Sequence, residues 1–210
     1  MIVMPQILDS LALAGEDLAL RAMFAARKRV FVDLLKWNVP VISGRYEVDQ
    51  FDTRDADYLI LLDHAQQHRA SARLLRTERP HLLSELYPFL CERPAPSGPT
   101  VREITRFCLD PLPGAAERRH ARDQLVFALV DHALQEGVTD YTGVATLGWF
   151  AQIVRFGWHC VALGAPTRVG DQTLVALHIC VDERTRPCLE ASGLYREPAF
   201  RLAGNRPVLA

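Results

Sequence analysis

The spacing of apolar residues along the chain predicts a succession of helices. Between residues 15 and 35 the large apolar residues recur at steps of three and four, which is typical of an amphipathic helix. Residues 114–137 show a second helical pattern that ends at a glycine, as helices often do. Shorter helices are expected at 80–89, 147–156 and 183–190.

Short apolar runs between these segments predict strands. The runs 58–63 and 70–75 are separated by a polar segment, so an antiparallel hairpin is expected. The run 101–109 has the β-branched and apolar content of a central strand. Further strands are expected at 141–146, 158–163 and 173–181. This order predicts an α/β (α+β) fold, a three-layer αβα sandwich with a mixed, mostly antiparallel twisted sheet.

Three segments show neither the helical spacing of apolar residues nor the apolar runs that are typical of strands. Residues 37–55 combine a proline, a glycine, mixed charges and three aromatics, so we expect a long functional loop that folds over something. Residues 164–172 are expected to be a shorter loop. The tail 192–210 is rich in glycine, proline and arginine and is expected to be loosely ordered. No repeat or boundary is evident, so residues 1–210 are predicted to form a single domain.

Composition narrows the classes of function. The chain has 210 residues, a formal net charge of -1 and a pI near 6.7, so it has no global field that attracts polyanions. We therefore expect no nucleic-acid partner. No apolar run approaches the ~20 residues that a membrane span needs, and acidic residues interrupt the apolar N-terminus. A soluble, cytoplasmic protein is expected.

The cysteines are five, an odd number, and none forms a C-x-x-C pair. We expect them to be small buried residues in a reducing compartment, with a single reactive thiol as the less favoured alternative. No metal site is predicted. The cysteines are Cys91, Cys108, Cys160, Cys180 and Cys188.

Charged and aromatic residues recur in the first half of the chain where a plain core would have no use for them. They are Arg27, Phe31, Trp37, Asp49, Asp52, Arg73, Glu103 and Arg106. Brought together, such acids, guanidiniums and aromatics would suit a small zwitterion. Each residue also has an ordinary explanation: a solvated arginine, aspartates in turns, or a cross-strand ion pair.

The run 101–109 carries one structural consequence of this hypothesis. Strict alternation places Glu103 and Arg106 on opposite faces of a strand. If both serve one site, the strand must bulge between them, and bulges are common beside active sites.

The local sequences around these residues resemble the acyl-homoserine-lactone synthases, the autoinducer enzymes of bacterial quorum sensing. Arg27, Phe31 and Trp37 match the family's N-terminal motif, and the E-x-D-x-F-D run is Glu47–Asp52. The R-L-L-x-T strand is Arg73–Thr77, and the E-x-[ST]-R-F strand is Glu103–Phe107. The resemblance covers about the first half of the chain. It departs at Arg76, where the family often has proline, and at Phe150, where it commonly has glutamate.

The resemblance implies a fold similar to the GNAT acyltransferases and a two-step reaction. The amine of S-adenosylmethionine is acylated by a fatty acyl thioester on acyl carrier protein or coenzyme A. The homoserine carboxylate then displaces 5'-methylthioadenosine and closes the lactone. S-adenosylmethionine is therefore a substrate, and no cofactor is expected.

The resemblance also assigns roles. Glu103 is the leading general-base candidate, and Arg106, Asp49 and Asp52 are further catalytic candidates. The residues expected to bind S-adenosylmethionine are Arg27, Phe31, Trp37, Arg73 and Phe107, although Arg73 has the alternative role of tying the aspartates to the sheet. The acyl-chain pocket is expected to involve Thr142, Val144, Thr146, Leu147, Phe150 and Ile153. Members that prefer 3-oxo chains tend to carry a threonine near here, for which Thr142 and Thr146 are both candidates.

Two rival functions are a GNAT-type N-acyltransferase that uses acyl-CoA and a non-catalytic domain that senses S-adenosylmethionine. GNAT enzymes usually hold the coenzyme A pyrophosphate in a glycine-containing loop at a helix N-terminus. The corresponding stretch, Arg118–Arg122, contains no glycine. This favours a carrier protein whose acidic surface would meet Arg118, Arg119 and Arg122, with a solvated basic face as the commoner explanation and coenzyme A still open.

Overall fold

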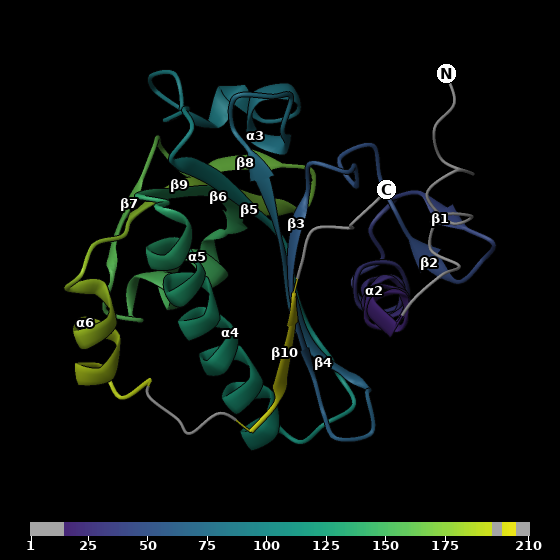
Figure 1. Cartoon of the computed structure of the whole chain (residues 1–210). Helices are drawn as coiled ribbons and strands as arrows, with labels where there is room; N and C mark the ends of the chain where they lie inside the picture. The colour runs from purple at the N-terminus through teal and green to yellow at the C-terminus, as the bar shows by residue number, and fades with distance from the viewer. Residues whose placement is uncertain (1–14, 195–198, 205–210) are drawn as a thin grey trace. The chain divides into compact units, whose positions relative to one another are not determined.

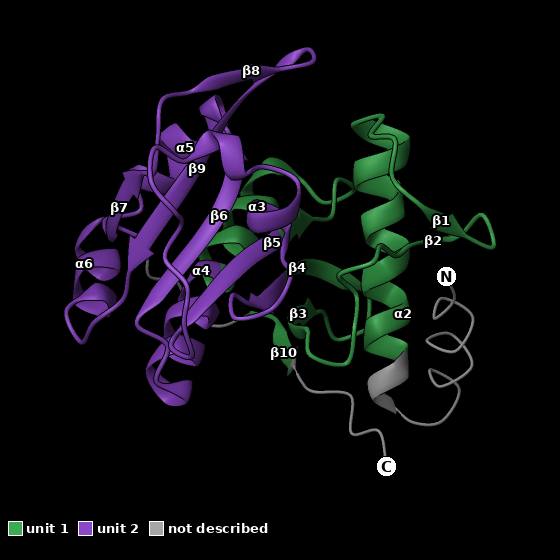
Figure 2. Ribbon diagram, turned by 90° about the horizontal axis from the view of Figure 1, so that it is seen from above, with its two compact units in different colours: residues 1–72, 106–125, 198–210 green, residues 73–105, 126–197 purple. Residues whose placement is uncertain are grey.

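The computed structural model of the chain describes residues 15–194 and 199–204 (Figure 1). The chain divides into two compact units, shown in separate colours in Figure 2. Unit 1 comprises residues 1–72, 106–125 and 198–210, and unit 2 comprises residues 73–105 and 126–197. The single domain stays a prediction, and most of the apolar N-terminal segment lies outside the described residues.

Unit 1 begins with the predicted amphipathic helix. Helix α2 (Gly15–Arg27) continues directly into a π-helical segment, η1 (Lys28–Leu34). The loop that follows contains a small antiparallel hairpin of β1 (Val41–Ile42) and β2 (Tyr46–Glu47), and α2 packs against β2. The remaining strands of this unit are β3 (Asp57–Leu62), the first part of β4 (His68–Arg76) and β10 (Arg201–Gly204).

Strand β10 corrects one expectation about the tail. Residues 201–204 pair antiparallel with β3, with Arg201 opposite Leu62. These four residues are therefore part of the sheet, whereas we expected a loosely ordered tail. Ladder hydrogen bonds to a buried strand supply order that local composition does not reveal. The parts of the tail at 195–198 and 205–210 lie outside the described residues.

Unit 2 contains most of the second half of the chain. Its elements, some of which are shared with unit 1, are α3 (Leu82–Glu85), the 3-10 turn η2 (Pro88–Leu90), β5 (Val101–Leu109), α4 (Ala115–Glu136), β6 (Asp140–Thr146), α5 (Leu147–Val154), β7 (His159–Ala162), β8 (Thr167–Val169), β9 (Gln172–Cys180) and α6 (Thr185–Ala191). Gly137, at a φ of 68°, follows α4 as the predicted terminating glycine.

The strands form a mixed, mostly antiparallel sheet, as predicted. Hydrogen-bonded neighbours follow the order β10-β3-β4-β5-β6-β9-β7, and β8 also pairs with β9. Strands β5 and β6 are parallel, while β9 runs antiparallel to β6, β7 and β8. The expected loop at 164–172 therefore contains a strand, and Gly170, at a φ of 60°, lies in the turn between β8 and β9.

Helices cover both faces of the sheet in unit 2. The hydroxyl of Tyr141 on β6 donates a hydrogen bond to the carbonyl of Leu129 on α4 at 2.9 Å. Val144 lies on the opposite face by strand alternation and packs with Leu83 and Leu90, which belong to α3 and η2. The side chains of Tyr141 and Val144 therefore face different layers of helices.

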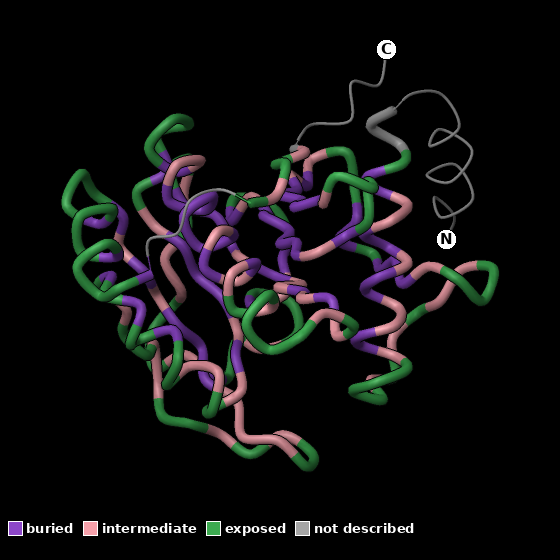
Figure 3. Tube along the Cα trace, turned by 90° about the horizontal axis from the view of Figure 1, so that it is seen from below, coloured by how far each residue is buried: buried purple, intermediate pink, exposed green. Residues whose placement is uncertain are grey.

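Figure 3 colours the chain by burial, with the buried segments in purple. Burial differs among the strands: β3 is largely buried, whereas the residues of β7 and β8 are exposed or partly exposed. Residues 58–62 of β3 are all buried, as expected for a strand covered on both faces. Of the five cysteines, Cys108 is buried and Cys188 is exposed, while the other three are partly exposed, so the expectation of uniformly buried thiols was wrong. Among the described helices, none has both the length and the apolar character needed to cross a membrane.

Candidate active site

A buried group of charges lies in unit 1 and begins with Arg27, the last residue of α2. Its guanidinium is fully buried and donates two parallel hydrogen bonds, from Nη1 and Nη2 to the two carboxylate oxygens of Asp52, at 2.7 and 2.8 Å. Its Nε donates to Glu47. A guanidinium is tolerated in such a position only when its donors are paired, and the bidentate geometry is the strongest way to pair them.

These two carboxylates keep Arg27 charged. Burial by itself would lower the pKa of the guanidinium, because it disfavours the charged form. The attraction and hydrogen bonds of Asp52 and Glu47 outweigh burial and raise the pKa well above its ordinary value. Arg27 is therefore a fixed positive charge inside unit 1.

Arg106 joins the same group from β5. Its Nη2 donates to Oδ2 of Asp49 at 2.6 Å and to Oε1 of Glu47 at 2.9 Å. Glu47 therefore bridges two guanidiniums while its side chain is fully buried. We call Arg27, Glu47, Asp49, Asp52 and Arg106 the buried charge network.

Glu47 was not predicted as a site residue, although it begins the E-x-D-x-F-D run. An isolated glutamate in a loop is usually solvated, so residue type alone gave no reason to choose it. A usable signal was its position two residues before Asp49, because residues two apart in an extended segment share a side.

The two aspartates also shape the loop that carries them. Oδ2 of Asp52 accepts the backbone N–H of Asp49 at 2.8 Å, and Oδ1 of Asp49 accepts that of Phe51 at 2.8 Å. The hydroxyl of Tyr58 donates to Asp52 at 2.9 Å. Asp49 and Asp52 are thus turn residues and guanidinium partners at once, so the two explanations we kept apart both hold.

The predicted aromatic pair lies beside Arg106. The rings of Phe31 and Trp37 stack with their centroids 4.8 Å apart and their planes at 12°. The guanidinium carbon of Arg106 lies 5.6 Å from the Phe31 centroid and 6.0 Å from that of Trp37. This is cation-π range, so the aromatics add to the attraction that holds the guanidinium in place.

Strand β5 departs from regular geometry at Arg106. The residue has a φ of 50°, in the left-handed region that non-glycine residues rarely adopt. Arg106 and Phe107 are both partly exposed, so the alternation of burial also breaks here. The irregularity falls at the end of the segment where we predicted a bulge, and the bonds to Glu47 and Asp49 offset the local strain.

Glu103 and Arg73 belong to unit 2, and both are buried. The two carboxylate oxygens of Glu103 accept the backbone N–H groups of Leu82 and Leu83 at the start of α3, each at 2.8 Å. Nε of Arg73 donates to the hydroxyl of Thr105 at 2.9 Å. The convergence of these residues with the buried charge network stays a prediction.

The residues expected to line the acyl pocket divide into two sets. Thr142 and Val144 lie on one face of β6, and Val144 packs in an apolar cluster with Leu83 and Ala176. Thr142 is the parallel register partner of Glu103, so the two residues are neighbours on adjacent strands. Thr142 is fully buried, and within the described chain its hydroxyl has no hydrogen-bond partner.

The other expected pocket residues lie at α5. The hydroxyl of Thr146 caps this helix by accepting the N–H of Trp149 at 3.3 Å. Leu147 is 43% exposed, Phe150 is partly exposed and Ile153 is buried. None of these four residues belongs to the apolar cluster that contains Val144.

The three arginines near the start of α4 differ in their surroundings. Arg118 donates to the carbonyls of Pro111 and Pro113 at 3.0 and 2.8 Å. Arg122 pairs with the neighbouring Asp123 at 2.6 Å, whereas Arg119 is exposed. Only Arg119 presents its side chain mainly to solvent.

Known proteins share this fold. The chain is similar to an acyl-CoA N-acyltransferase from Pseudomonas aeruginosa, with a TM-score of 0.54, 19% identity, and coverage of 80% of this chain and 94% of that one. At this identity the similarity concerns the fold alone. Together with the mixed sheet and its two helical layers, it defines a GNAT-like acyltransferase fold.

A narrower class follows from the sequence. Residues 13–189 match the family described as autoinducer synthase. An acyl-homoserine-lactone synthase from Ralstonia nicotianae is 32% identical over 174 residues, which is 80% of this chain and 84% of that relative. The chain is also similar to the solved structure of BjaI, a CoA-dependent acyl-homoserine lactone synthase with SAM and isopentyl-CoA. The TM-score is 0.76 and the sequence identity is 25%, and the match covers 88% of this chain and 85% of the BjaI chain. The chain belongs to the autoinducer synthase family.

Glu47→Gln tests the buried charge network. The substitution keeps the size of the side chain but removes the carboxylate that the two guanidiniums share, so Nε of Arg27 loses its charged acceptor and Arg106 keeps only Asp49. We expect a loss of about 1.5–3 kcal/mol in the free energy of unfolding, measured by urea denaturation. The control is Asp33→Asn, which removes a more exposed ion pair with Lys28 and should cost less than about 1 kcal/mol. Equal losses in the two variants would contradict the network.

Proposed function

We propose that this protein is an acyl-homoserine-lactone synthase. It transfers a fatty acyl group from a thioester to the amine of S-adenosylmethionine, and the homoserine carboxylate then closes the lactone and releases 5'-methylthioadenosine. The observation that carries the proposal is the buried charge network, which is built on the family's E-x-D-x-F-D run and lies beside the stacked Phe31 and Trp37.

The charges of S-adenosylmethionine complement these groups. The substrate carries a carboxylate, an ammonium and a sulfonium, so it needs both guanidinium donors and carboxylate acceptors. Asp49, Asp52, Arg27 and Arg106 hold it directly or hold the loop that encloses it. Phe31, Trp37 and Phe107 supply stacking or cation-π attraction. Arg73 assists by linking the aspartates to the sheet.

Glu103 is the general base in this proposal. The ammonium of S-adenosylmethionine must lose a proton before its nitrogen can attack the thioester, and a positioned carboxylate takes that proton directly or through water. The hydrogen bonds from Leu82 and Leu83 hold the carboxylate in place.

The remaining steps need less from the side chains. The oxyanion of the tetrahedral intermediate would be met by backbone N–H groups where β5 is irregular near Arg106. Sulfonium is a good leaving group, so lactonisation needs mainly a substrate folded with its carboxylate close to the γ-carbon.

Thr142 is the residue we assign to the acyl chain. A buried hydroxyl without a partner costs about 1–3 kcal/mol, and a ligand oxygen would remove that cost. A 3-oxo group on the acyl chain offers such an oxygen beside Glu103, the register partner of Thr142. Thr146 is the weaker candidate because its hydroxyl already caps α5. The adjoining cluster around Val144 supplies apolar wall for the chain.

The acyl donor is a carrier protein or coenzyme A. BjaI, solved with isopentyl-CoA, supports a coenzyme A thioester. The absence of glycine in Arg118–Arg122 supports a carrier protein, for which Arg119 is the exposed contact in this stretch.

The reaction itself is tested by mass spectrometry. Full-length protein incubated with S-adenosylmethionine and either acyl carrier protein or coenzyme A thioesters should yield an N-acyl-homoserine lactone and 5'-methylthioadenosine. Glu103→Gln should lower the rate by about 10²–10⁴-fold without abolishing S-adenosylmethionine binding, because it removes the base. Glu78→Gln changes an exposed glutamate and should react normally.

Three outcomes would contradict this proposal. Full activity in Glu103→Gln would remove Glu103 from the role of base. An acylated amine without a lactone would indicate a plain N-acyltransferase, and binding of S-adenosylmethionine without any product would indicate a sensor.

Thr142→Val tests the acyl assignment. Valine keeps the shape and removes the hydroxyl, so the ratio of kcat/KM for 3-oxo over unsubstituted donors should fall by about tenfold, as expected for one lost hydrogen bond. The matched control, Thr146→Val, should cost about 1 kcal/mol of stability through its helix cap and leave that ratio unchanged. An equal change of the ratio in both variants, or none in Thr142→Val, would contradict the assignment.

A further inference from the structure

A group of metal-ligating side chains lies on two neighbouring strands of unit 2. It consists of Asp140 at the start of β6 and of His178 and Cys180 near the end of β9, with one donor atom from each lying within 4.8 Å of the others. Asp140 is directly opposite Cys180 in the antiparallel ladder, and His178 is two residues before Cys180. The three side chains therefore share one face of the sheet.

The geometry separates this group from a catalytic triad. Nε2 of His178 lies 2.6 Å from Oδ1 of Asp140 and 3.8 Å from Sγ of Cys180. A nucleophile–histidine–acid relay needs the thiol and the carboxylate on different ring nitrogens. Here both approach the same nitrogen, which is how donor atoms gather around a shared cation.

The separations suit a small tetrahedral ion after a modest adjustment. Zinc bonds of about 2.3 Å to sulfur and about 2.0 Å to nitrogen place those two ligand atoms about 3.5 Å apart. The sulfur and nitrogen are already near that separation. The pair formed by His178 and Asp140 must open from 2.6 Å to about 3.3 Å, which rotation of the carboxylate can supply.

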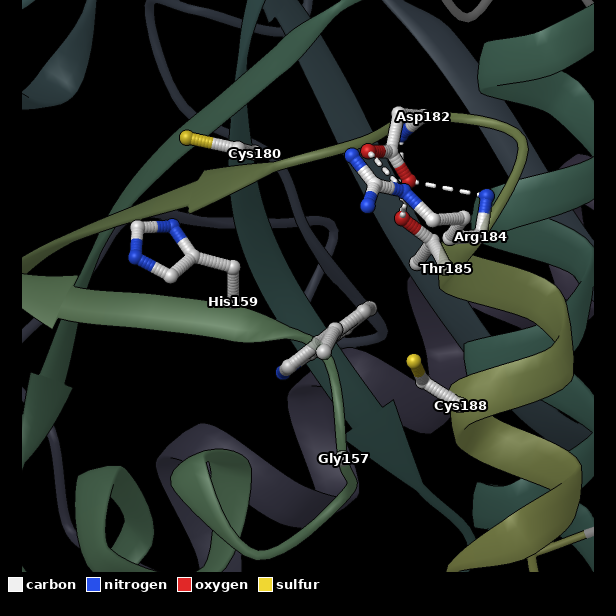
Figure 4. Close-up of a pocket in the computed structure, with 8 residues that line it drawn as sticks. Gly157, His159, Cys180, Asp182, Arg184, Thr185 and Cys188 are labelled. Carbon is white, nitrogen blue, oxygen red and sulfur yellow. Dashed lines mark hydrogen bonds and ion pairs between the residues drawn. The ribbon is translucent and has the colours of Figure 1, made fainter.

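The edge strand carries a candidate for a fourth ligand. His159 on β7 is the antiparallel register partner of Cys180, so its side chain lies on the same face as the group. Figure 4 shows His159 and Cys180 on neighbouring strands at a pocket of about 550 Å³ that both residues line. His159 is exposed, so its ring is free to turn, and the pocket gives an ion access from solvent.

The ligand types also favour a cation. Asp140 supplies a carboxylate, and Cys180 supplies a thiol that a bound divalent ion would convert to the thiolate.

We propose that Asp140, His178 and Cys180 bind one divalent cation, with His159 as the fourth ligand. A thiolate together with imidazole selects Zn²⁺ and similar borderline or soft ions over Mg²⁺ and Ca²⁺. The proposal revises our expectation that the chain has no metal site. The signal in the sequence is His178-x-Cys180 on a strand, a spacing that the C-x-x-C pattern does not include. The inference is independent of the proposed function.

Cobalt is the probe, because a thiolate bound to Co²⁺ produces a charge-transfer absorption. Full-length protein freed of metal with a chelator is titrated with CoCl₂, and ZnCl₂ is then added. We expect one Co²⁺ per chain, a near-ultraviolet charge-transfer band, and displacement of that band by Zn²⁺. Cys180→Ser should abolish the band, and His178→Ala or Asp140→Asn should weaken binding by at least about tenfold.

Two cysteine variants serve as matched controls. Cys160→Ser changes a residue on β7 next to the site, and Cys188→Ser changes an exposed thiol that lines the same pocket. Both should keep the band, and circular dichroism verifies that every variant is folded. A wild-type protein without the band, a band that survives Cys180→Ser, or a band lost in either control overturns the site. Unchanged affinity in His159→Ala overturns the assignment of the fourth ligand.

Discussion

The burial of one guanidinium governs the organisation of unit 1. Arg27 ends α2 with no exposed surface, and a charge in that position costs several kcal/mol unless carboxylates meet it. Glu47 and Asp52 must therefore reach inward from the following loop. These ion pairs fix the conformation of the loop that carries Glu47 and Asp52, although it contains little regular secondary structure.

The same constraint extends to the strand that carries Arg106. Glu47 is shared between Arg27 and Arg106, so the second guanidinium is held by a carboxylate that the first has already fixed. The left-handed backbone at Arg106 is strained, and its ion pairs and its contacts with Phe31 and Trp37 stabilise it. Rigid support of this kind holds side chains in place before a substrate arrives, which is what efficient binding and positioning require.

Sequence patterns predicted the elements whose signals are local. The helix over 15–34, strand β5 and helix α4 each have a strong period and suitable ends. Strand β10 was missed because only its pairing with a distant strand orders it, and β8 was missed because three residues show no clear period. Motif spacing identified Arg27, Asp49 and Asp52, but the role of Glu47 depends on two partners 20 and 59 residues away. Asp140 and His178, 38 residues apart, were likewise beyond local patterns.

We propose that the buried charge network shapes the binding site for S-adenosylmethionine. Arg106→Lys tests it most directly, because lysine keeps the charge and loses the planar fork that contacts Glu47 and Asp49. The measurement is the Kd of S-adenosylmethionine by isothermal titration calorimetry on full-length protein verified to be folded. We expect binding at least about tenfold weaker than in the wild type, equivalent to about 1.4 kcal/mol. Unchanged affinity in a folded Arg106→Lys protein would contradict it.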